Sequence, residues 1–542
     1  MGNAYQVGYN DDSRSRLTGV KLPSGRMQRV SYETTATGNT ETTVTDAKGN
    51  KRTGLASASG TELSTSDKGN GSVAPITTSY EYDAEGRQTK SKNTEGNYRL
   101  SVYDAKGQTL QTKTFDKTGE LTLTSKYSYD ISGNMTEEKD YEVKEGAETL
   151  LRGKTYEYTG LDKLSKVTET DGSRTSTISY SYDMEDDLTG VTYSGNASKV
   201  DGLEYVYNDY KWLTEIRAVI SGNTKTLREY SYTNDGKVAT IKDHRDMGSA
   251  SGNDFTQIDF SYDDLDRPVK MEYRENGTGE VRESYAVKYD KNGSIISEDA
   301  VNGYPSSEDS GKLDRLKEYT YDADGQLTAT EIKDDIDNTV KDISYTYDAA
   351  GNRAKETESG SGTDDGRVTT DYTYNSLDQM TGAKTMQAED TVSDKTYTYD
   401  GNGNQIKEAD SENKITNIMT YDGENRLSTV TKKEIKSVEA SEDSEDTDGD
   451  GITVNTEEEV TTKVQSNKYN GDGQRISKTE GNNRTKYFYQ DGAVLCTTDG
   501  NNGMTSFNML GTEGNIIASA RNENGSEKYY YYNKDIRNST TN

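Results

Sequence analysis

The chain repeats one short pattern, Tyr-x-Tyr-Asp-x-x-Gly, which a polar and then usually an apolar residue follow. In the copy at Tyr345–Arg353, alternation places both tyrosines on one face of a β-strand. Asp at the head of a four-residue turn can bond the backbone ahead of it. Gly at the fourth position accepts the positive φ that a hairpin with a glycine bulge requires. Each copy therefore predicts the tip of one β-hairpin.

The copies recur along nearly the whole chain, mostly about 20–30 residues apart, which is the length of one supersecondary unit in a repeat architecture. Five of the clear copies supply the predicted structural residues Tyr80, Tyr82, Asp83, Gly86, Tyr127, Tyr129, Asp130, Gly133, Tyr319, Tyr321, Asp322, Gly325, Tyr345, Tyr347, Asp348, Gly351, Tyr397, Tyr399, Asp400 and Gly403. A further clear copy begins at Tyr180, and half-preserved copies lie between them.

The fourth turn position tests the hairpin prediction. In sixteen copies aligned from Tyr82 to Tyr469, this residue is Gly ten times, Asp four times, Asn once and Lys once, at Lys211. Asp and Asn are the residues other than glycine that best tolerate a left-handed backbone. The substitutions thus follow a backbone requirement. An apolar residue such as Leu164 or Leu188 commonly follows the turn, so the return strand adds to the tyrosine layer.

Composition alone would favour disorder, because Leu, Ile, Val and Phe make up only roughly 14 per cent of the residues and the net charge is −31. The 41 tyrosines argue otherwise, since each buries a ring while its hydroxyl reaches water or a partner. We predict an all-β fold: one continuous unit over 1–542, a long spiralling antiparallel sheet of hairpins that forms a hollow shell. Residues 54–74 are predicted to form a loop, and residues 431–465 an acidic insert.

Several classes of function are disfavoured. An isoelectric point near 4.6 argues against a nucleic-acid partner, and no apolar run reaches the length of a membrane span. Met1–Ala4 opens no signal peptide, so an exported protein would contain this chain as a segment of a longer precursor. No acid–base pair or nucleotide-binding glycine motif stands out, and we predict that the chain is not an enzyme and requires no cofactor.

The acidic insert matches the spacing of a calcium-binding loop. Its ligands would be Asp446, Asp448 and Asp450 through their carboxylates, Ile452 through its carbonyl and Glu457 through both carboxylate oxygens. The flanks, 432–438 and 458–464, have strand character rather than the helical character of an EF-hand. A solvated acidic loop on a long hairpin is the alternative.

Histidine, cysteine and tryptophan each occur once in the chain. His244, the only histidine, lies in a polar stretch that we predict to be a loop. Cys496 has strand neighbours and is predicted to be a buried apolar residue. Trp212 follows the Lys211 turn, where it would either pack against the adjacent hairpin or stack on a sugar.

The repeated motif, as at Tyr80–Arg87, Tyr319–Gln326 and Tyr397–Asn404, resembles that of the YD-repeat or Rhs-repeat family over nearly the whole chain. The family includes bacterial polymorphic toxins, wall-associated proteins, cocoon subunits of toxin complexes and teneurins. The resemblance implies a hollow β-shell that in many bacterial relatives encloses a C-terminal toxin. Residues 529–542 resemble the start of the conserved core that ends such shells, although Asn538 stands where relatives usually have Gly. No Asp-Pro occurs, so the self-cleavage site is not in this segment.

The sequence thus predicts a shell segment of a secreted or cell-surface bacterial protein, with a C-terminal toxin in cis as its partner. The alternative is an adhesive module that binds cell-surface glycans through exposed tyrosines and Trp212. A glycosidase is the third and least supported hypothesis.

Overall fold

The computed structural model describes residues 5–9, 15–195, 198–245, 254–276, 280–302, 315–333, 339–360, 366–439 and 455–540. All regular structure in these ranges is β-strand, and 41 strands are present. The first are β1 (Gln6–Tyr9), β2 (Leu17–Lys21), β3 (Met27–Thr34), β4 (Thr40–Thr45), β5 (Lys51–Ala56), β6 (Glu62–Gly69), β7 (Ile76–Tyr82), β8 (Gln88–Lys92), β9 (Tyr98–Tyr103) and β10 (Thr109–Phe115). Next come β11 (Leu121–Tyr129), β12 (Met135–Lys144), β13 (Ala147–Tyr158), β14 (Leu164–Thr170), β15 (Thr175–Tyr182), β16 (Leu188–Ser194), β17 (Val200–Tyr207), β18 (Leu213–Ile220), β19 (Asn223–Tyr232), β20 (Val238–His244) and β21 (Phe255–Tyr262).

The remaining strands follow at the same rhythm. They are β22 (Pro268–Glu275), β23 (Val281–Tyr289), β24 (Ile295–Asn302), β25 (Arg315–Tyr321), β26 (Leu327–Lys333), β27 (Thr339–Tyr347), β28 (Arg353–Gly360), β29 (Val368–Tyr374), β30 (Met380–Gln387) and β31 (Asp390–Tyr399). The chain continues with β32 (Gln405–Asp410), β33 (Ile415–Tyr421), β34 (Leu427–Glu439), β35 (Asn455–Tyr469), β36 (Arg475–Glu480), β37 (Asn483–Gln490), β38 (Ala493–Asp499), β39 (Met504–Leu510), β40 (Ile516–Glu523) and β41 (Ser526–Tyr531).

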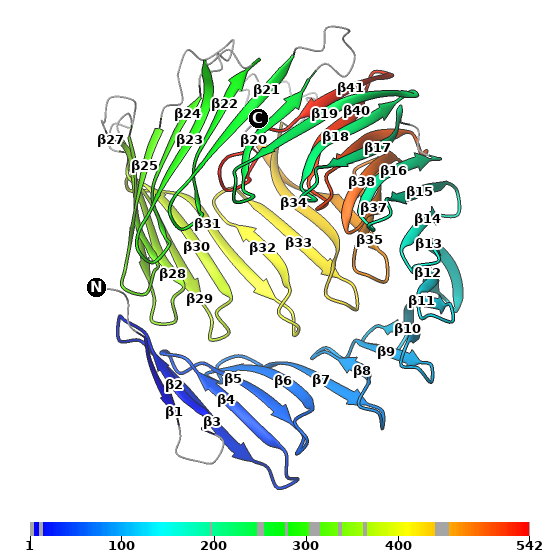
Figure 1. Ribbon diagram of the computed structural model, residues 1–542. Coiled ribbons are helices and arrows are strands. Elements are labelled where there is room, and N and C mark those ends of the chain that lie inside the picture. Colours follow the sequence, from blue (N-terminus) through cyan, green and yellow to red (C-terminus); the bar gives the residue numbers. More distant parts are fainter. Residues whose placement is uncertain are drawn as a thin grey trace, which may run out of the picture.

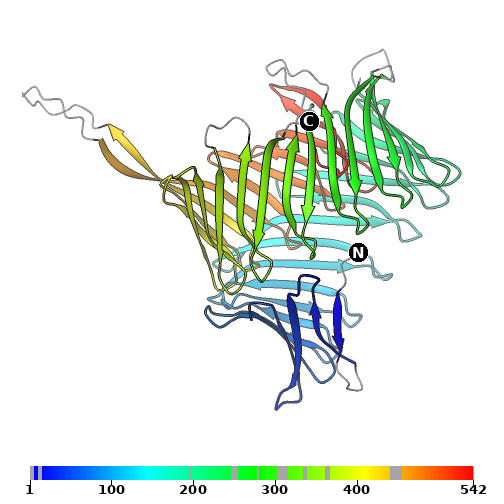
Figure 2. The same cartoon turned by 90° about the vertical axis from the view of Figure 1, so that its left-hand side faces the viewer.

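The strands form a single antiparallel meander. Each strand pairs with the strand before it and the strand after it in the sequence, from β1–β2 to β40–β41. The sheet curls into a wall that winds around the molecule (Figures 1 and 2). The prediction of an all-β spiralling shell is confirmed.

The sheet has two edges along which its hairpin turns lie. We call the edge with the turns after β7, β9, β11 and the later odd-numbered strands the repeat rim, because most Tyr-x-Tyr-Asp turns occur there. The edge with the turns after even-numbered strands is the opposite rim. One copy of the motif is an exception. Its turn, Asp116–Glu120, comes after Phe115 at the end of β10 and therefore lies on the opposite rim.

Turns about 300 residues apart in the sequence meet where the second half of the wall passes the first half. We call this contact the seam: the repeat rim of β25–β36 lies against the opposite rim of β2–β12. Asp324 accepts hydrogen bonds from the backbone of Ser24 at 2.8 Å and from the guanidinium of Arg26 at 2.8 Å. Lys48 pairs with Asp348 at 2.5 Å, and Arg99 pairs with Glu424 at 3.3 Å. Side-chain bonds therefore join the two passes of the wall, while strand pairing stays between sequence neighbours.

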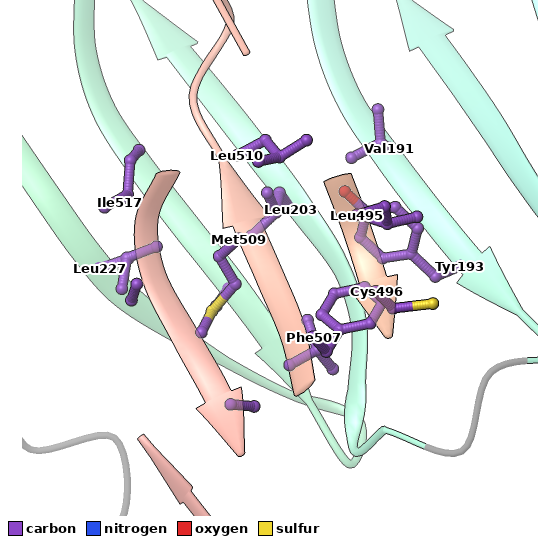
Figure 3. Close-up of a cluster of buried hydrophobic side chains, with 14 of the residues drawn as sticks. Val191, Tyr193, Leu203, Leu227, Leu495, Cys496, Phe507, Met509, Leu510 and Ile517 are labelled. Carbon is purple, nitrogen blue, oxygen red and sulfur yellow. The ribbon is translucent and has the colours of Figure 1, made fainter. Parts of the chain in front are cut away.

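A second layer covers one part of the wall. Strands β37–β40 lie on the concave side of β15–β19, and the side chains between the two layers form the largest buried apolar cluster (Figures 1 and 3). Phe507 and Met509 from β39 are fully buried there against wall residues such as Tyr193 and Leu203. The ring centroids of Tyr193 and Phe507 are 5.0 Å apart in an edge-to-face arrangement.

Two local predictions are wrong. Residues 54–74 are not a loop, because most of them lie in β5 and β6, joined by a turn in which the Ser57 hydroxyl accepts the Thr61 amide at 3.0 Å, as Asp does elsewhere. Threonine suits extended strands, and serine can replace aspartate as the turn acceptor. His244 also lies in a strand, at the end of β20, where its Nε2 contacts the Glu229 carboxylate at 2.9 Å.

The predicted strand character on both sides of the acidic insert is confirmed. Strands β34 and β35 pair with each other and extend away from the wall as one long hairpin (Figure 2). The proposed calcium ligands Asp446, Asp448, Asp450 and Ile452 lie outside the described residues. Glu457 belongs to β35, but its side chain is outside the described part. The calcium loop therefore stays a prediction.

Candidate functional site: the tyrosine clasps and the seam

Each repeat turn is held by its first residue. In the turn at Asp348, the Gly351 amide donates to the Asp348 carbonyl at 3.0 Å, and the Asp348 amide donates to the Asn352 carbonyl at 2.9 Å. Its carboxylate also accepts from the amides of Ala350 at 2.9 Å and Asn352 at 3.0 Å. Partial burial opposes ionisation of Asp348, but bonding to Lys48 and Asn352 keeps its pKa below the ordinary value. Asp348 is thus an ionised backbone acceptor.

The fourth turn residue has a positive φ in all sixteen aligned copies, including the six where it is not glycine. These six are Asp162 (59°), Asp186 (69°), Lys211 (62°), Asp266 (63°), Asp378 (57°) and Asn425 (62°). Lys211, the only residue of the series that tolerates this backbone poorly, adopts it as well. The backbone requirement predicted from the sequence is confirmed.

The second tyrosine of the motif joins each hairpin to the one before it. Its hydroxyl donates to the carbonyl of the residue that opens the return strand of the preceding hairpin: Tyr347 donates to Leu327 at 2.6 Å, and Tyr399 to Met380 at 2.7 Å. In the described part of the chain, fifteen such bonds, which we call tyrosine clasps, occur between Tyr103 and Tyr489.

The position of the accepting carbonyl explains the clasp. The ladder shifts register between Thr346 and Tyr347, so that Tyr347 lies opposite Arg353, and the same shift recurs at the other repeat turns. A bulge of this kind interrupts the strand ladder. The next tyrosine hydroxyl bonds the carbonyl beside that interruption, as Tyr374 does with Arg353 at 2.9 Å. Phe115 has no hydroxyl, and its ring stacks on Tyr98 with centroids 4.6 Å apart.

The predicted tyrosine face is also seen. Both tyrosines of each of the five clear copies are half-buried, whereas the residue between them is exposed. The first tyrosine can contact a buried acid: Tyr319 donates to Glu298 at 3.1 Å, and burial together with this carboxylate raises the pKa of Tyr319 to about 12. Arg537 pairs with the same carboxylate at 3.1 Å, which attaches residues 533–540 to the wall.

The seam contains a pair of buried acids that the sequence did not single out. Glu138 and Asp140, on the same face of β12, are 4% and 1% exposed. Asp140 accepts from Ser125 at 2.5 Å and from the Gly471 amide across the seam. Only glycine fits at 471, since a Cβ there would lie 2.5 Å from the Asp140 carboxylate. Burial, with the nearby charges of Asp472 and Asp140, raises the pKa of Glu138 to about 7, so this group binds a proton near neutrality.

The only cysteine and the only tryptophan of the chain are both packed against other side chains. Cys496 is 3% exposed, and burial raises the pKa of its thiol to about 11, as expected for a buried apolar residue. Trp212 packs between Tyr210 and Tyr232 of its own and the next hairpin, with ring centroids 5.2 and 5.1 Å away. The packing interpretation of Trp212 is therefore confirmed. Among the described residues, no group of three or more His, Cys, Asp or Glu side chains could hold a metal.

The comparisons with known proteins agree with this geometry. The family model Teneurin YD-shell matches residues 191–365. The tRNA3(Ser)-specific nuclease WapA of Bacillus spizizenii is 30% identical over 225 residues, and the tRNA nuclease WapA of Bacillus subtilis is 29% identical over 224. Each match covers 41% of this chain but only 7% of the relative, so the chain spans a small part of the curated proteins it resembles.

Solved structures match over almost the whole chain. A crystal structure of a TcdB2-TccC3 complex has a TM-score of 0.53 and 13% identity, covering 98% of this chain and 30% of that one. A structure of the Tc holotoxin pore of Photorhabdus luminescens has the same TM-score and identity, with coverage of 98% and 29%. No helix suited to crossing a membrane is found in the described ranges. The match of residues 191–365 to the Teneurin YD-shell model, together with the repeated turns and the clasped meander, supports a YD-repeat (Rhs-repeat) shell.

Proposed function

We propose that this chain is a wall segment of a secreted or cell-surface bacterial shell that encloses or presents a toxin domain C-terminal to it in the same polypeptide. The observation that carries the proposal is the clasped meander: one sheet winds past itself and is closed along a seam by bonds such as Asp324–Arg26. A wall built in this way can separate an interior from solvent and partners without any reacting side chain. The likeness to toxin-complex structures supports the same role.

Protection of the enclosed domain tests the proposal. The complete translation product of the reading frame would be treated with a nonspecific protease under conditions in which the wall stays folded. We expect the domain that follows residue 542 to survive at least tenfold longer within the product than when expressed alone. Equal rates of digestion, or a reading frame without such a domain, would refute enclosure. Small-angle scattering that shows a solid particle or a flexible coil would refute the shell itself.

We further propose that the chain has no nuclease activity, although two relatives carry that activity in their names. The matched region is a small fraction of those proteins. The chain has a net charge of −31, which repels a polyanionic substrate. We expect the isolated chain to leave tRNA intact, and cleavage above the rate of a buffer control would contradict this.

The adhesive alternative is supported by one feature. Tyr210 is 75% exposed and stacks on Trp212, so its outer face is open to a sugar ring. Binding on a glycan array that Tyr210→Ala abolishes would favour this function over enclosure.

A further inference from the structure

A buried lysine of the second layer contacts two polar side chains at once. Lys486, on β37, is the only lysine among the described residues that is buried, with 9% of its surface exposed. Its Nζ donates to the Asp171 carboxylate at 2.8 Å and to the side-chain carbonyl of Asn502 at 2.7 Å. An ammonium, a carboxylate and a carboxamide therefore meet where the turn after β14 touches the second layer.

Both partners of the lysine are held in place by their turns. Oδ1 of Asp171 accepts from the backbone amides of Ser173 and Arg174, both at 2.9 Å, and this leaves Oδ2 to face Lys486. Asn502 takes the fourth position of the turn after β38, with a φ of 69°. Its side-chain NH₂ group donates to the Ser173 hydroxyl at 3.2 Å. Reacting groups fixed at such short separations can react as if within one small molecule.

The site is also drier than the other lysine ion pairs of the described ranges. The side chains of Lys486 and Asp171 are 11% and 9% exposed. In the pair with the next most buried lysine, the side chains of Lys333 and Glu318 are 20% and 46% exposed. A site with little water favours attack by the amine on the carboxamide over attack by water.

We propose that Lys486 and Asn502 become joined by an isopeptide bond, with Asp171 as the acid–base group. Nζ of the lysine attacks Cγ of Asn502, so that a bond from Nζ to Cγ forms and the bond from Cγ to Nδ2 breaks. Asp171 first takes a proton from the ammonium, which frees the lone pair of Nζ, and gives this proton to the departing nitrogen. It then takes the second proton that Nζ loses and passes it to the released ammonia, which leaves as ammonium. The step requires no oxidant and no cofactor.

The contacts of Asp171 determine how fast this bond can form. Burial opposes ionisation of Asp171, but the bonds from Lys486 and Ser173 lower its pKa. Asp171 is therefore a weak base, and the free amine forms rarely. The three groups also meet only when β14 and β37 are in place. We therefore expect the bond to form slowly, after the chain has folded.

The isopeptide bond would staple the second layer beside its contact with the wall. It links β37 to the turn after β38, and its new N–H can donate to Asp171 as the ammonium did. A disulfide within the chain is impossible, because Cys496 is the only cysteine. A cross-link of this kind restricts the unfolded chain and so stabilises the fold, as a disulfide does. The inference goes beyond the proposed function, since the bond would form whether or not the wall encloses a domain.

The mass of the intact, denatured 542-residue chain tests the proposal. The purified chain would be kept folded until its mass is constant. We expect most molecules to be lighter than the sequence predicts by one ammonia. Trypsin should fail to cut after Lys486, and chymotrypsin, which cuts between the two residues, should release two peptides still joined through Lys486 and Asn502. A chain at its calculated mass would be a plain ion pair and would overturn the proposal. Loss of one water, with a link to Asp171, would overturn the assignment of Asn502.

Two variants test the assigned roles while keeping the turns. Asn502→Gly suits the positive φ and removes the carboxamide. Asp171→Asn removes the acid–base group but keeps a turn acceptor, since Asn208 accepts the same turn bonds elsewhere. We expect no loss of ammonia from Asn502→Gly, and a loss about a hundredfold slower from Asp171→Asn. Lys48→Met, which removes the seam pair with Asp348, should leave the loss unchanged.

The two variants can also contradict the proposal. Loss of ammonia that persists in Asn502→Gly would exclude Asn502 as the reacting group, and an unchanged rate in Asp171→Asn would exclude the acid–base role. The mass of the unmodified chain needs no variant, so it decides the proposal even if a variant fails to fold.

Discussion

The wall of β2–β10 and the wall of β15–β19 are built from the same hairpins but hold together differently. In the described part of residues 5–122 no apolar side chain is buried, whereas β15–β19 face a second layer across a core that includes Ile216 and Leu227, both 0% exposed. The single-layer part relies on turn bonds, ladders and the seam. The difference shows that the repeat alone specifies a wall, and that a dry core forms only where the sheet covers itself.

The largest expected effect distinguishes the two regions with the same substitution. Phe507→Ala in the two-layer core removes a ring that is 0% exposed, and we expect it to lower the free energy of unfolding by about 3–5 kcal/mol. Phe115→Ala in the single-layer wall removes a half-buried ring stacked on Tyr98, with an expected loss of about 1 kcal/mol. Chemical denaturation measures both, and losses of similar size would contradict the comparison.

A second pair compares the seam with a free part of the repeat rim. Leu377 and Leu161 both occupy the third position of a repeat turn, but Leu377 is 8% exposed in the seam and Leu161 is 74% exposed. We expect Leu377→Ala to destabilise the fold by about 2 kcal/mol. Leu161→Ala is expected to change stability by less than about 0.5 kcal/mol, as at other exposed positions. Equal shifts in the unfolding midpoint would mean that the seam does not stabilise the wall.

The sequence predicted the hairpins because their determinants are local. Asp348, Ala350 and Gly351 interact within one turn, so nine residues carry the whole requirement, and the same requirement explains Asp162 and Asn425 at the glycine position. The shared face of the two tyrosines could be predicted because they alternate with one other residue along a strand. The stretch at residues 54–74 was missed because serine replaces aspartate as its turn acceptor, and no tyrosine marks its strands.

The seam and the second layer could not be predicted in the same way. Arg26 and Asp324 are separated by 298 residues, and nothing in either turn identifies the other. The sequence around Glu138 does not distinguish it from the other acids of the chain. Only the fold places Asp472, in the turn between β35 and β36, near it. The burial of Cys496 was expected from its neighbours, but its packing partners on β15–β19 depend on how the whole sheet curves.

The raised pKa of the seam acid Glu138 should make the stability of the protein depend on pH. Its pKa is about 7 in the folded protein and ordinarily about 4.5, so the folded state binds more protons between these values. Stability is therefore expected to fall as the pH rises from about 4.5 to about 7. Glu138→Gln, which stays neutral, should remove this slope and stabilise the protein at pH 8 by an amount on the order of 2 kcal/mol. Thermal unfolding between pH 4 and pH 8 measures the slope.

Glu142, on the same strand, provides a control of opposite sign. Burial opposes its ionisation, but Lys468 across the seam at 2.8 Å and Lys144 lower its pKa. Its contribution to stability is present above the ordinary pKa and is lost as the pH falls. Glu142→Gln should therefore be harmful at pH 7 and neutral in acid. If both variants changed stability in the same direction at pH 7, the assigned charge states of the seam would be wrong.

The smallest expected effect tests the clasp itself. Tyr347→Phe keeps the ring but removes the bond to the Leu327 carbonyl, with an expected loss of about 1 kcal/mol. Tyr210→Phe, at an exposed ring outside the series, should be neutral. A clasp links only neighbouring hairpins, so faster amide exchange should appear in β26–β28 and not in β15–β19. Combining Tyr347→Phe with Tyr158→Phe should add the two losses, since distant sites act independently. A neutral Tyr347→Phe would show that the rings, and not their hydroxyls, hold successive hairpins together.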